Sequence, residues 1–426
     1  MTTPTQEAIT AVWRRESVRL VGALTRVTRD LDLAEDLAQD ALVAALEQWP
    51  DGGVPANPGA WLMAVAKRRA VDQFRRNDTL RRRTAELAHG LEEAEMPDLD
   101  DAVDHIEDDV LRLAFLACHP TLPPESRTAL TLRLVGGLTT TEIAHAYLVK
   151  DATMGQRISR AKRLLAESGA SMEMPTGPER AQRLADVMAV VYLVFNEGYA
   201  ATSGDSWTRP ELCLEGMRLA RILASLVPDD PEVQGLQALL ELQGSRLAAR
   251  RDADGRPVLL EAQDRSRWDQ LLVHRGLAAL DRATTLATTL GTTLGTTLGR
   301  PVGTYVLQAS IAACHARARR PEDTDWPEIA RLYDVLATAA PGPVVEVNRA
   351  VAHGRAFGPA AGLAILDATD DDPALAGSHL VLAVRADLLE RAGRRTEAAA
   401  AFRAAAILTR NTDERALLTR RAEENA

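Results

Sequence analysis

Aromatic side chains are scarce in this 426-residue sequence, where Phe, Trp and Tyr together make up 4% of the residues. Runs of β-branched residues are also scarce, whereas Ala, Leu and Arg are abundant. Such a composition favours helices that pack through small side chains. The fold class predicted is therefore all-α, and a chain of this length is expected to form about two to four domains.

Cysteines and long apolar runs are nearly absent as well. The three cysteines show no C-x-x-C spacing, which argues against a disulfide framework or a zinc site and favours a reducing cytoplasm. No apolar run approaches the roughly 18 residues that a membrane span needs. The opening residues, MTTPTQEAIT, do not have the pattern of a signal peptide. We therefore expect a cytoplasmic protein without membrane contact.

Motifs of catalysis are missing too. The sequence contains no Walker loop, no metal-ligand spacing and no G-x-S-x-G elbow. We therefore predict no enzymatic activity, no catalytic residue, no cofactor and no metal.

Lysine is rare, since only three of the 50 basic residues are lysines. The net charge of −10 argues against uniform affinity for nucleic acid, but the charge is unevenly distributed. Eight basic residues lie between positions 67 and 83, and eleven acidic residues without any Lys or Arg follow between 84 and 109. A basic block next to an acidic one indicates a partner or a regulator.

Helical periodicity, interrupted by turn-rich and acidic stretches, divides the chain into segments. The break PDGGVPANP (50–58) interrupts the first helical segment. The Thr- and Gly-rich run at 284–299 is predicted to be a mobile loop, because its composition disfavours a helix. The segments predicted are helices over 8–76, an acidic flexible linker over 77–105, helices over 106–168 and a helical region over 180–426.

The end of the last region, GRRTEAAAAFRAAAIL (393–408), places Ala398, Phe402 and Ala405 on one helix face. This spacing resembles half of a tetratricopeptide repeat, in which small residues let paired helices approach closely.

The segment DLDLAEDLAQDALVAALEQW (30–49) predicts an amphipathic helix with an acidic face opposite Leu33, Leu37, Ala41 and Leu42. By itself this is typical of a solvated helix surface. The order of residues, however, resembles the core-binding part of region 2 in extracytoplasmic-function sigma factors, where an Asp-Leu-x-Gln-Asp run docks on the polymerase β′ subunit. The resemblance assigns core binding to Asp32, Glu35, Asp36, Gln39 and Asp40.

The next segment, NPGAWLMAVAKRRAVDQFRR (57–76), is similar to that family's P-x-x-W-L…A-x-x-x-x-x-D-x-x-R-R pattern. A basic helix beside a turn can hold phosphates while loop residues engage the bases of a melted strand. Trp61 and Phe74 could stack on bases, but core packing is the alternative for both. The residues that the resemblance assigns to the promoter −10 element are Lys67, Arg68, Arg69, Asp72, Arg75 and Arg76.

A helix-turn-helix is predicted in LTTTEIAHAYLVKDATMGQRISRAKRLL (138–165). The threonines from Thr139 to Thr141 can cap a short helix, and a second helix is expected to start near Asp151. Ile143, Met154, Ile158 and Leu165 supply the apolar face, and the second helix carries a basic stripe suited to the major groove.

This element resembles sigma region 4 and ends in that region's Arg-x-x-Arg-Ala-Lys. The residues assigned to the promoter −35 element are Thr139, Thr140, Thr141, Thr153, Gln156, Arg157, Arg160 and Arg163.

Together the motifs resemble an extracytoplasmic-function sigma factor with a large tetratricopeptide-like extension. The resemblance implies that core RNA polymerase (β′ and β subunits) and double-stranded promoter DNA are partners. We further expect an intramolecular contact between the extension and the sigma regions. An alternative stays open, in which a helical scaffold, ligand-binding or enzymatic C-terminal domain carries a degenerate sigma module.

Polar strings inside the apolar helices of the extension suggest a regulatory pocket. Ion pairs and hydrogen bonds between packed helices are the competing explanation, because buried polar groups must be satisfied. The residues assigned to the pocket are Asn196, Glu197, Tyr199, Asp264, Arg265, Trp268 and Asp269.

Overall fold

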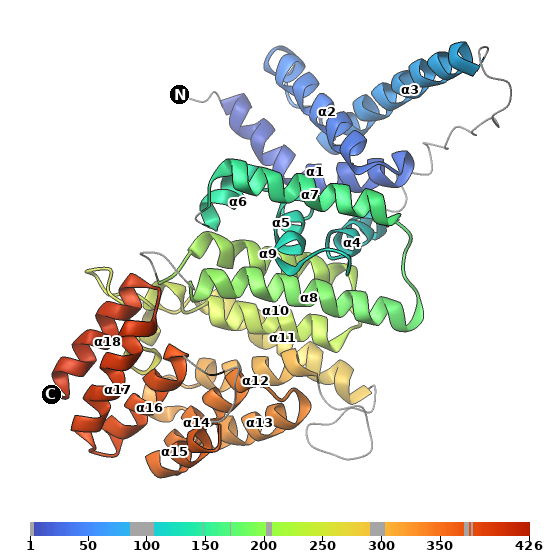
Figure 1. Ribbon diagram of the computed structural model, residues 1–426. Helices are drawn as coiled ribbons and strands as arrows, with labels where there is room; N and C mark the ends of the chain where they lie inside the picture. Colours follow the sequence, from blue (N-terminus) through green and yellow to red (C-terminus); the bar gives the residue numbers. More distant parts are fainter. Residues whose placement is uncertain are drawn as a thin grey trace. The chain divides into compact units, whose positions relative to one another are not determined.

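The computed structural model describes residues 4–85, 106–147, 149–170, 172–201, 207–289, 303–369, 375 and 378–426 (Figure 1). Within these ranges the elements are helices, and an isolated β-bridge pairs Arg251 with Pro257. The all-α fold predicted from composition is therefore confirmed. The chain divides into two compact units, Met1–Val190 and Val191–Ala426, which are described separately below.

The first unit is built from seven helices and the beginning of an eighth within its described residues. The helices are α1 (Pro4–Thr28), α2 (Leu31–Gly52), α3 (Pro58–Ala85), α4 (Ile106–Ala117), α5 (Pro124–Leu134), α6 (Thr140–Ala146), α7 (Asp151–Ser168) and α8 (Gly177–Tyr199).

Helix α1 packs against α2, α3 and α4 and so forms the centre of the N-terminal bundle. Leu24 of α1, Leu37 of α2 and Leu62 of α3 are all fully buried there. Asp30 caps α2 by accepting a hydrogen bond from the backbone N–H of Leu33 at 3.0 Å. The break expected at 50–58 is shorter than predicted, because α2 continues through Pro50 as far as Gly52.

A buried carboxylate joins α4 to α1. The side chain of Asp109 is completely buried and lies 3.0 Å from Arg26 of α1 and 3.3 Å from Arg112 one turn later. Gly22 makes this contact possible, since a Cβ at that position would lie 3.1 Å from the Asp109 carbonyl oxygen. Two arginines around one carboxylate compensate for its burial.

The second unit contains the remainder of α8 and ten further α-helices within its described residues. They are α9 (Pro210–Leu226), α10 (Pro231–Gly244), α11 (Gln270–Thr289), α12 (Thr304–Arg317), α13 (Trp326–Ala339), α14 (Pro343–Phe357), α15 (Pro359–Asp367), α16 (His379–Arg391), α17 (Arg395–Leu408) and α18 (Thr412–Glu424). Short 3-10 helices η2 (Leu247–Ala249), η3 (Leu260–Ala262), η4 (Arg265–Arg267) and η5 (Pro321–Asp323) connect some of them.

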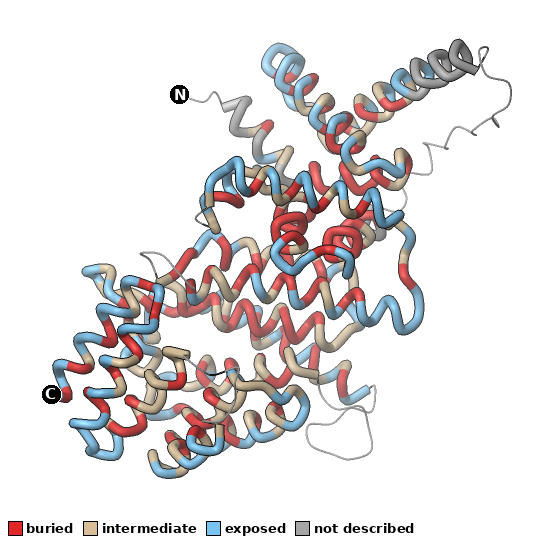
Figure 2. Tube along the Cα trace, in the orientation of Figure 1, coloured by how far each residue is buried: buried red, intermediate tan, exposed pale blue. Residues whose placement is uncertain are grey.

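Helix α10 forms the core of the second unit, packing against α9, α11 and α12. It is buried along most of its length (Figure 2), which is typical of a central helix. Gly235 allows α12 to come close, because a Cβ there would lie 2.8 Å from the backbone nitrogen of Val306.

Helices that follow one another in the sequence pack together toward the C-terminus, as in the pairs α13–α14, α16–α17 and α17–α18. Gly393, with φ of +77°, makes the turn between α16 and α17. Ala398, Phe402 and Ala405 are fully buried in one cluster, which confirms that they share a helix face.

The Thr-rich run departs from its prediction as a loop. Residues 284–289 are the last turns of α11, and residues 290–299 of the run lie outside the described residues. The hydroxyls of Thr284 and Thr288 donate to the backbone carbonyls of Leu280 and Thr284, at 3.0 and 2.8 Å. Because these hydroxyls bond back to the preceding turn, threonine is accommodated inside the helix.

Candidate nucleic-acid interface

The helix-turn-helix begins at a reciprocal cap on α6. The hydroxyl of Thr139 accepts a hydrogen bond from the Glu142 backbone N–H at 3.1 Å, and the Glu142 carboxylate accepts one from the Thr139 N–H at 2.8 Å. Ile143 and Ala144 are fully buried behind this cap. The short capped helix predicted from the threonine run is confirmed.

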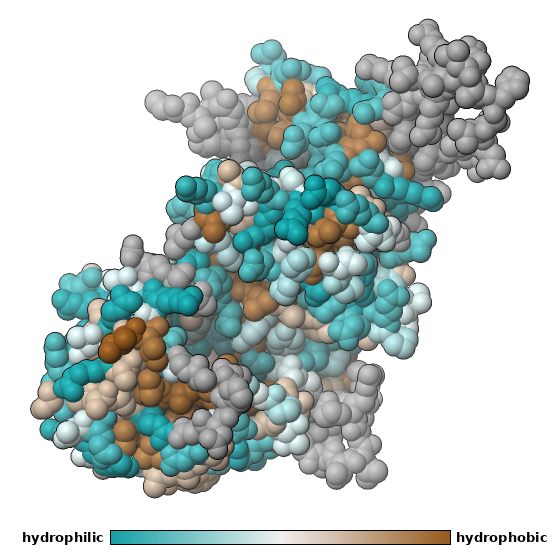
Figure 3. All heavy atoms as spheres, viewed as in Figure 1, coloured by the Kyte–Doolittle hydropathy of each residue, from teal (hydrophilic) through white to brown (hydrophobic). Residues whose placement is uncertain are grey.

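Helix α7 starts at Asp151, as predicted, and packs on α5 and α6. Its buried face consists of Met154, Ile158, Ala161 and Leu165, which recur at helical spacing. Hydrophilic side chains predominate over this helix in Figure 3. An amphipathic second helix of this kind has the geometry required to enter a major groove.

The −35 residues predicted on α7 lie mainly on its exposed face. Thr153, Gln156 and Arg160 are exposed, and within the described part of the chain Arg160 has no ion-pair partner. Arg157 is half-buried and lies 3.3 Å from the carboxylate of Glu125.

The remaining −35 residues lie at the two ends of the motif. Arg163 is exposed and lies 3.8 Å from Glu167, one turn later. At the start of α6, Thr139 and Thr141 are exposed and Thr140 is half-buried. The Thr141 hydroxyl donates to Asp151 at 2.7 Å, which ties the start of α6 to the start of α7.

The acidic residues predicted on α2 do not share one environment. Asp36 and Gln39 are exposed, whereas Glu35 is only 7% exposed. Glu35 lies 3.2 Å from Arg133 of α5 and 2.5 Å from Lys162 of α7. Ion pairs to Glu35 therefore link both α5 and α7 to the acidic face of α2.

Lys162 bridges two of these carboxylates, since its ammonium nitrogen also lies 2.7 Å from exposed Asp32. Burial by itself lowers the pKa of Lys162, but Glu35 and Asp32 outweigh it and the net pKa is raised. Lys162 thus stays charged at neutral pH and faces α2, although the sequence suggested a basic stripe directed at DNA.

The −10 residues predicted on α3 differ in how far they are exposed. Arg68, Asp72 and Arg75 are exposed, and Lys67 is half-buried. Arg69 is also half-buried and lies 2.9 Å from Asp40 of α2.

Three further residues were predicted on α3, namely Arg76 for the −10 element and Phe74 and Trp61 as possible stacking partners of bases. The side chains of Arg76 and Phe74 lie outside the described residues. Trp61 packs edge-on against Trp49 of α2, with ring centroids 5.3 Å apart, which supports the core alternative for that residue.

In the second unit, the seven residues of the predicted pocket separate into several groups. Asp264 and Asp269 cap η4 and α11 by accepting backbone hydrogen bonds from Ser266 and Leu271, both at 2.9 Å. Glu197 pairs with Arg209 at 2.6 Å. These residues fit the competing explanation, in which polar groups satisfy one another between helices.

Asn196 is half-buried on α8. The other three pocket residues, Tyr199, Arg265 and Trp268, lie around Arg246 and Arg250, which were not predicted from the sequence. The Arg250 guanidinium lies 3.9 Å from the centroid of the Tyr199 ring. Arg246 lies 5.7 Å from the ring centroids of both Tyr199 and Trp268, and Arg265 lies 5.1 Å from that of Trp268. The two arginines are four residues apart and follow an apolar helix, and this helical spacing indicates that they share one face.

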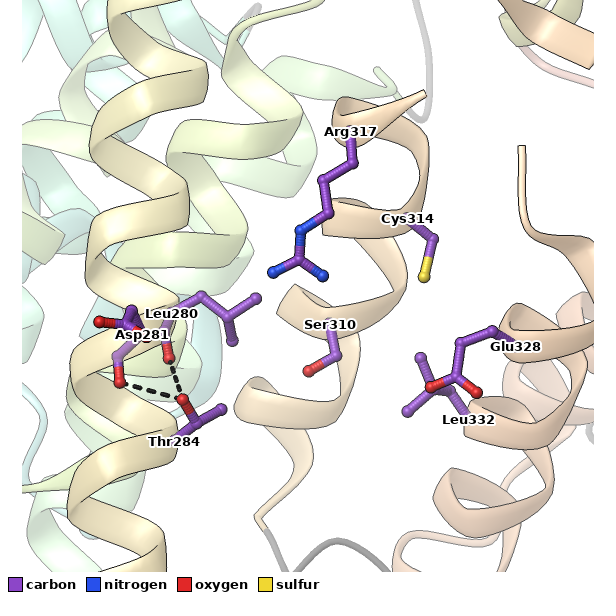
Figure 4. Close-up of a pocket in the computed structure, with 8 residues that line it drawn as sticks. All are labelled: Leu280, Asp281, Thr284, Ser310, Cys314, Arg317, Glu328 and Leu332. Carbon is purple, nitrogen blue, oxygen red and sulfur yellow. Dashed lines mark hydrogen bonds between the residues drawn. The ribbon is translucent and has the colours of Figure 1, made fainter. Parts of the chain in front are cut away.

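A cavity of about 200 Å³ opens between α11, α12 and α13 (Figure 4). Burial, followed by the nearby Glu328 and Asp325, raises the pKa of Cys314 on its wall to about 11. This cysteine is therefore a thiol at neutral pH, and a nucleophilic role would require the thiolate. The lining residues are Leu280, Asp281, Thr284, Ser310, Cys314, Arg317, Glu328 and Leu332.

Among the helices described, none combines the length and apolar character of a membrane span. Within the same residues, no group of three His, Cys, Asp or Glu side chains is arranged to hold a metal ion.

Family comparisons match three parts of the chain. The Sigma-70 region 2 model matches residues 6–79, and the Sigma-70 region 4 model matches residues 112–165. A family of unknown function, DUF6596, matches residues 183–284. No solved structure matches the chain.

Relatives with curated sequences fall into two groups. An uncharacterized protein of Rhizobium meliloti is 43% identical over 404 residues, which is 93% of this chain and 91% of that protein. The probable ECF RNA polymerase sigma factor SigI of Mycobacterium tuberculosis is 31% identical over 163 residues, 38% of this chain and 56% of SigI.

The ECF RNA polymerase sigma factor SigK of Mycobacterium sp. (strain KMS) is 30% identical over 160 residues, which is 36% of this chain but 78% of SigK. Most of a sigma factor is thus matched by the first part of the chain, in the order region 2 and then region 4. The chain belongs to the extracytoplasmic-function family of RNA polymerase sigma factors.

Proposed function

We propose that this protein binds the β′ and β subunits of core RNA polymerase and directs the polymerase to specific promoters. The observation that carries the proposal is the capped helix-turn-helix, in which α7 exposes Thr153, Gln156 and Arg160 on the face opposite its buried stripe. Side chains near the N-terminus of such a helix are suited to contact base edges. In this role α7 reads the −35 element of double-stranded promoter DNA.

The remaining sigma functions are assigned to α2 and α3. Exposed Asp36 and Gln39, with Asp32 and Asp40 beside them, offer an acidic surface for the polymerase. Exposed Arg68 on α3 supplies positive charge for the backbone of the −10 element. We propose the domain limits 8–76 and 106–168 for these two functions, with 77–105 between them as the linker. Residues 77–85 of this stretch continue α3, and residues 86–105 lie outside the described residues.

The region after residue 180 is proposed to regulate the sigma regions in cis. Its support is that the similarity to the Rhizobium protein spans 93% of this chain, so the extension accompanies the sigma regions in that relative. Tethering gives even a weak contact an effective concentration on the order of millimolar. We propose no catalytic activity for the chain. We also propose that it acts in the cytoplasm, together with the polymerase.

The test is run-off transcription with purified core polymerase on the protein's own upstream region. Full-length protein should produce a transcript of one defined length, and core polymerase alone should not. A holoenzyme that forms but starts nowhere specific would argue against promoter recognition. Absence of holoenzyme would favour the alternative of a scaffold, ligand-binding or enzymatic domain with a degenerate sigma module.

A further inference from the structure

Three arginines of the second unit surround two aromatic rings. Arg246 and Arg250 flank η2, directly after the central helix α10, and Arg265 begins η4. The guanidinium of Arg246 lies between the rings of Tyr199 and Trp268, while Arg250 covers Tyr199 and Arg265 covers Trp268. Cation–π contacts of this kind bring three positive charges into one buried region.

Arg246 is the central group of this cluster, and it is only 7% exposed. Its guanidinium makes no hydrogen bond or ion pair with any residue that the structure describes, and its Nε atom is fully buried. Among the residues that the structure describes, the groups that shift its pKa are Tyr199, Arg250 and Tyr333, and none of these is a carboxylate. A buried guanidinium without an anionic partner is costly, so the site calls for a negative charge.

The two other arginines are held in place by the fold. Arg250 donates to the Tyr199 carbonyl at 2.9 Å, and Arg265 donates to the His315 carbonyl at 2.9 Å and to the Thr324 hydroxyl at 2.9 Å. These bonds fix their orientation but leave the Nε–H groups unused. Among the described residues, those of this cluster and its neighbour His315 have these buried nitrogens without a hydrogen-bond partner: Arg246 Nε, Arg250 Nε, Arg265 Nε, Trp268 Nε1 and His315 Nδ1.

The positive charge of the arginines also shifts the pKa values of His315 and Tyr199. Burial, with help from Arg246 and Arg265, lowers the pKa of His315 to about 3, so its imidazole is neutral at pH 7. Burial alone raises the pKa of Tyr199, but Arg246 and Arg250 outweigh it and the net pKa is lowered. The arginines push both pKa values in the direction that nearby positive charge produces.

We propose that Arg246, Arg250 and Arg265 form a binding site for a phosphate group, either as free phosphate or as a small phosphate monoester. Arginine suits this ligand because its planar N–H donors match phosphate oxygens. A dianion fits three guanidinium groups beside a neutral imidazole better than a monocarboxylate does. The site goes beyond the promoter function, and its occupancy can be measured without transcription.

The experiment is calorimetric titration of the full-length protein with inorganic phosphate, in buffer whose ionic strength is held constant with chloride. Wild-type protein should bind one phosphate per chain. Arg246→Met, which keeps the volume but removes the charge, should weaken binding by at least about tenfold. Arg403→Met is the matched control, since Arg403 is an exposed arginine on α17, and it should bind like wild type.

Thermal unfolding separates a binding role from a structural one. In phosphate-free buffer, Arg246→Met should unfold at a higher temperature than wild type, because it removes an uncompensated buried charge and Met packs well against aromatic rings. Saturating phosphate should raise the unfolding temperature of wild type but not that of the variant. A variant that is less stable than wild type without phosphate, and responds equally to it, would overturn the proposal.

A second variant covers the case in which Arg246→Met does not fold. Arg246→Lys keeps the charge but loses the planar donors, and it should also weaken phosphate binding. Tighter binding of glycerol 3-phosphate than of phosphate would identify an esterified ligand, and the reverse would identify free phosphate. No binding of either to wild type at millimolar concentration would show that Arg246 is merely hydrated, and the site would be rejected.

Discussion

The Lys162 ammonium nitrogen lies 2.5 Å from a carboxylate oxygen of Glu35, which joins α7 of the helix-turn-helix to α2 of the N-terminal bundle. Arg133 approaches the same carboxylate at 3.2 Å, so Glu35 is shared by two cations from the region 4 match. A glutamate enclosed in this way cannot contact polymerase at the same time. Core binding through Glu35 therefore requires α7 to leave α2.

Lys162→Met should release α7 from α2. Glu35 would keep only Arg133 as a partner, and we expect a loss of about 2 kcal/mol, between the values typical of exposed and of buried pairs. Hydrogen exchange of the α7 amides would then lose protection by about thirtyfold. Arg163→Met on the exposed side of α7 is the control, and equal protection in both variants would contradict the contact.

Asp36→Lys should weaken binding to core polymerase while leaving free DNA binding unchanged. Asp36 is exposed, so its reversal should not disturb the bundle. Adding Asp40→Lys should weaken core binding further, although it also breaks the pair with Arg69. Pull-down of core polymerase measures the effect, with Glu167→Lys on α7 as a control. Holoenzyme formation at wild-type level would refute the assignment of α2.

Arg157 and Arg163 should contribute differently to promoter binding. Arg157 lies in the half of α7 that is placed for bases, so Arg157→Ala should cost about 1–3 kcal/mol and relax one base position of the −35 element. Arg163 is placed for phosphates, and Arg163→Ala should weaken all sequences alike. Binding assays on a set of single-base promoter variants distinguish the two, and identical profiles would remove the proposed division.

Stability of the second unit should fall in acid because of His315. Its folded pKa of about 3 lies below the ordinary 6.5, so between these values the unfolded chain binds a proton that the folded chain does not. Stability contributed by neutral His315 is thus present above pH 6.5 and declines toward pH 3, by about 1.4 kcal/mol per pH unit. His315→Gln should flatten this part of a stability–pH curve, whereas His274→Gln at an exposed position should not.

Removing the second unit should change promoter-driven transcription sharply. A chain that ends at residue 190 keeps the first unit complete, whereas a cut near 178, where the sequence places the boundary, would remove residues that belong to it. One of these is Asp186, which lies 3.9 Å from Arg127 of α5. With folding checked by circular dichroism, equal transcription from the shortened and full chains would disprove regulation in cis.

Local patterns in the sequence were sufficient to predict the helix-turn-helix. Thr139 caps α6, and Ile143, Met154, Ile158 and Leu165 are buried as their spacing indicated. Caps and apolar periodicity depend on residues within about one or two turns, which a single sequence displays directly.

Contacts between distant segments could not be predicted in the same way. Lys162 looks like part of a basic stripe, and only the structure shows that its ammonium group pairs with Glu35 of α2. Arg246 looks like an exposed residue after a helix, and its burial becomes visible only with Tyr199 and Trp268 in place. In the sequence, both residues have the pattern of exposed charges, so their buried contacts could not be predicted.

The buried Asp109 carboxylate has a consequence for how the chain tolerates changes of length. Because Arg26 holds Asp109 at 3.0 Å, the start of α4 is fixed on α1 whatever number of residues precedes it. A fluorophore or a protease site inserted between α3 and α4 should therefore leave the packing of α4 on α1 unchanged.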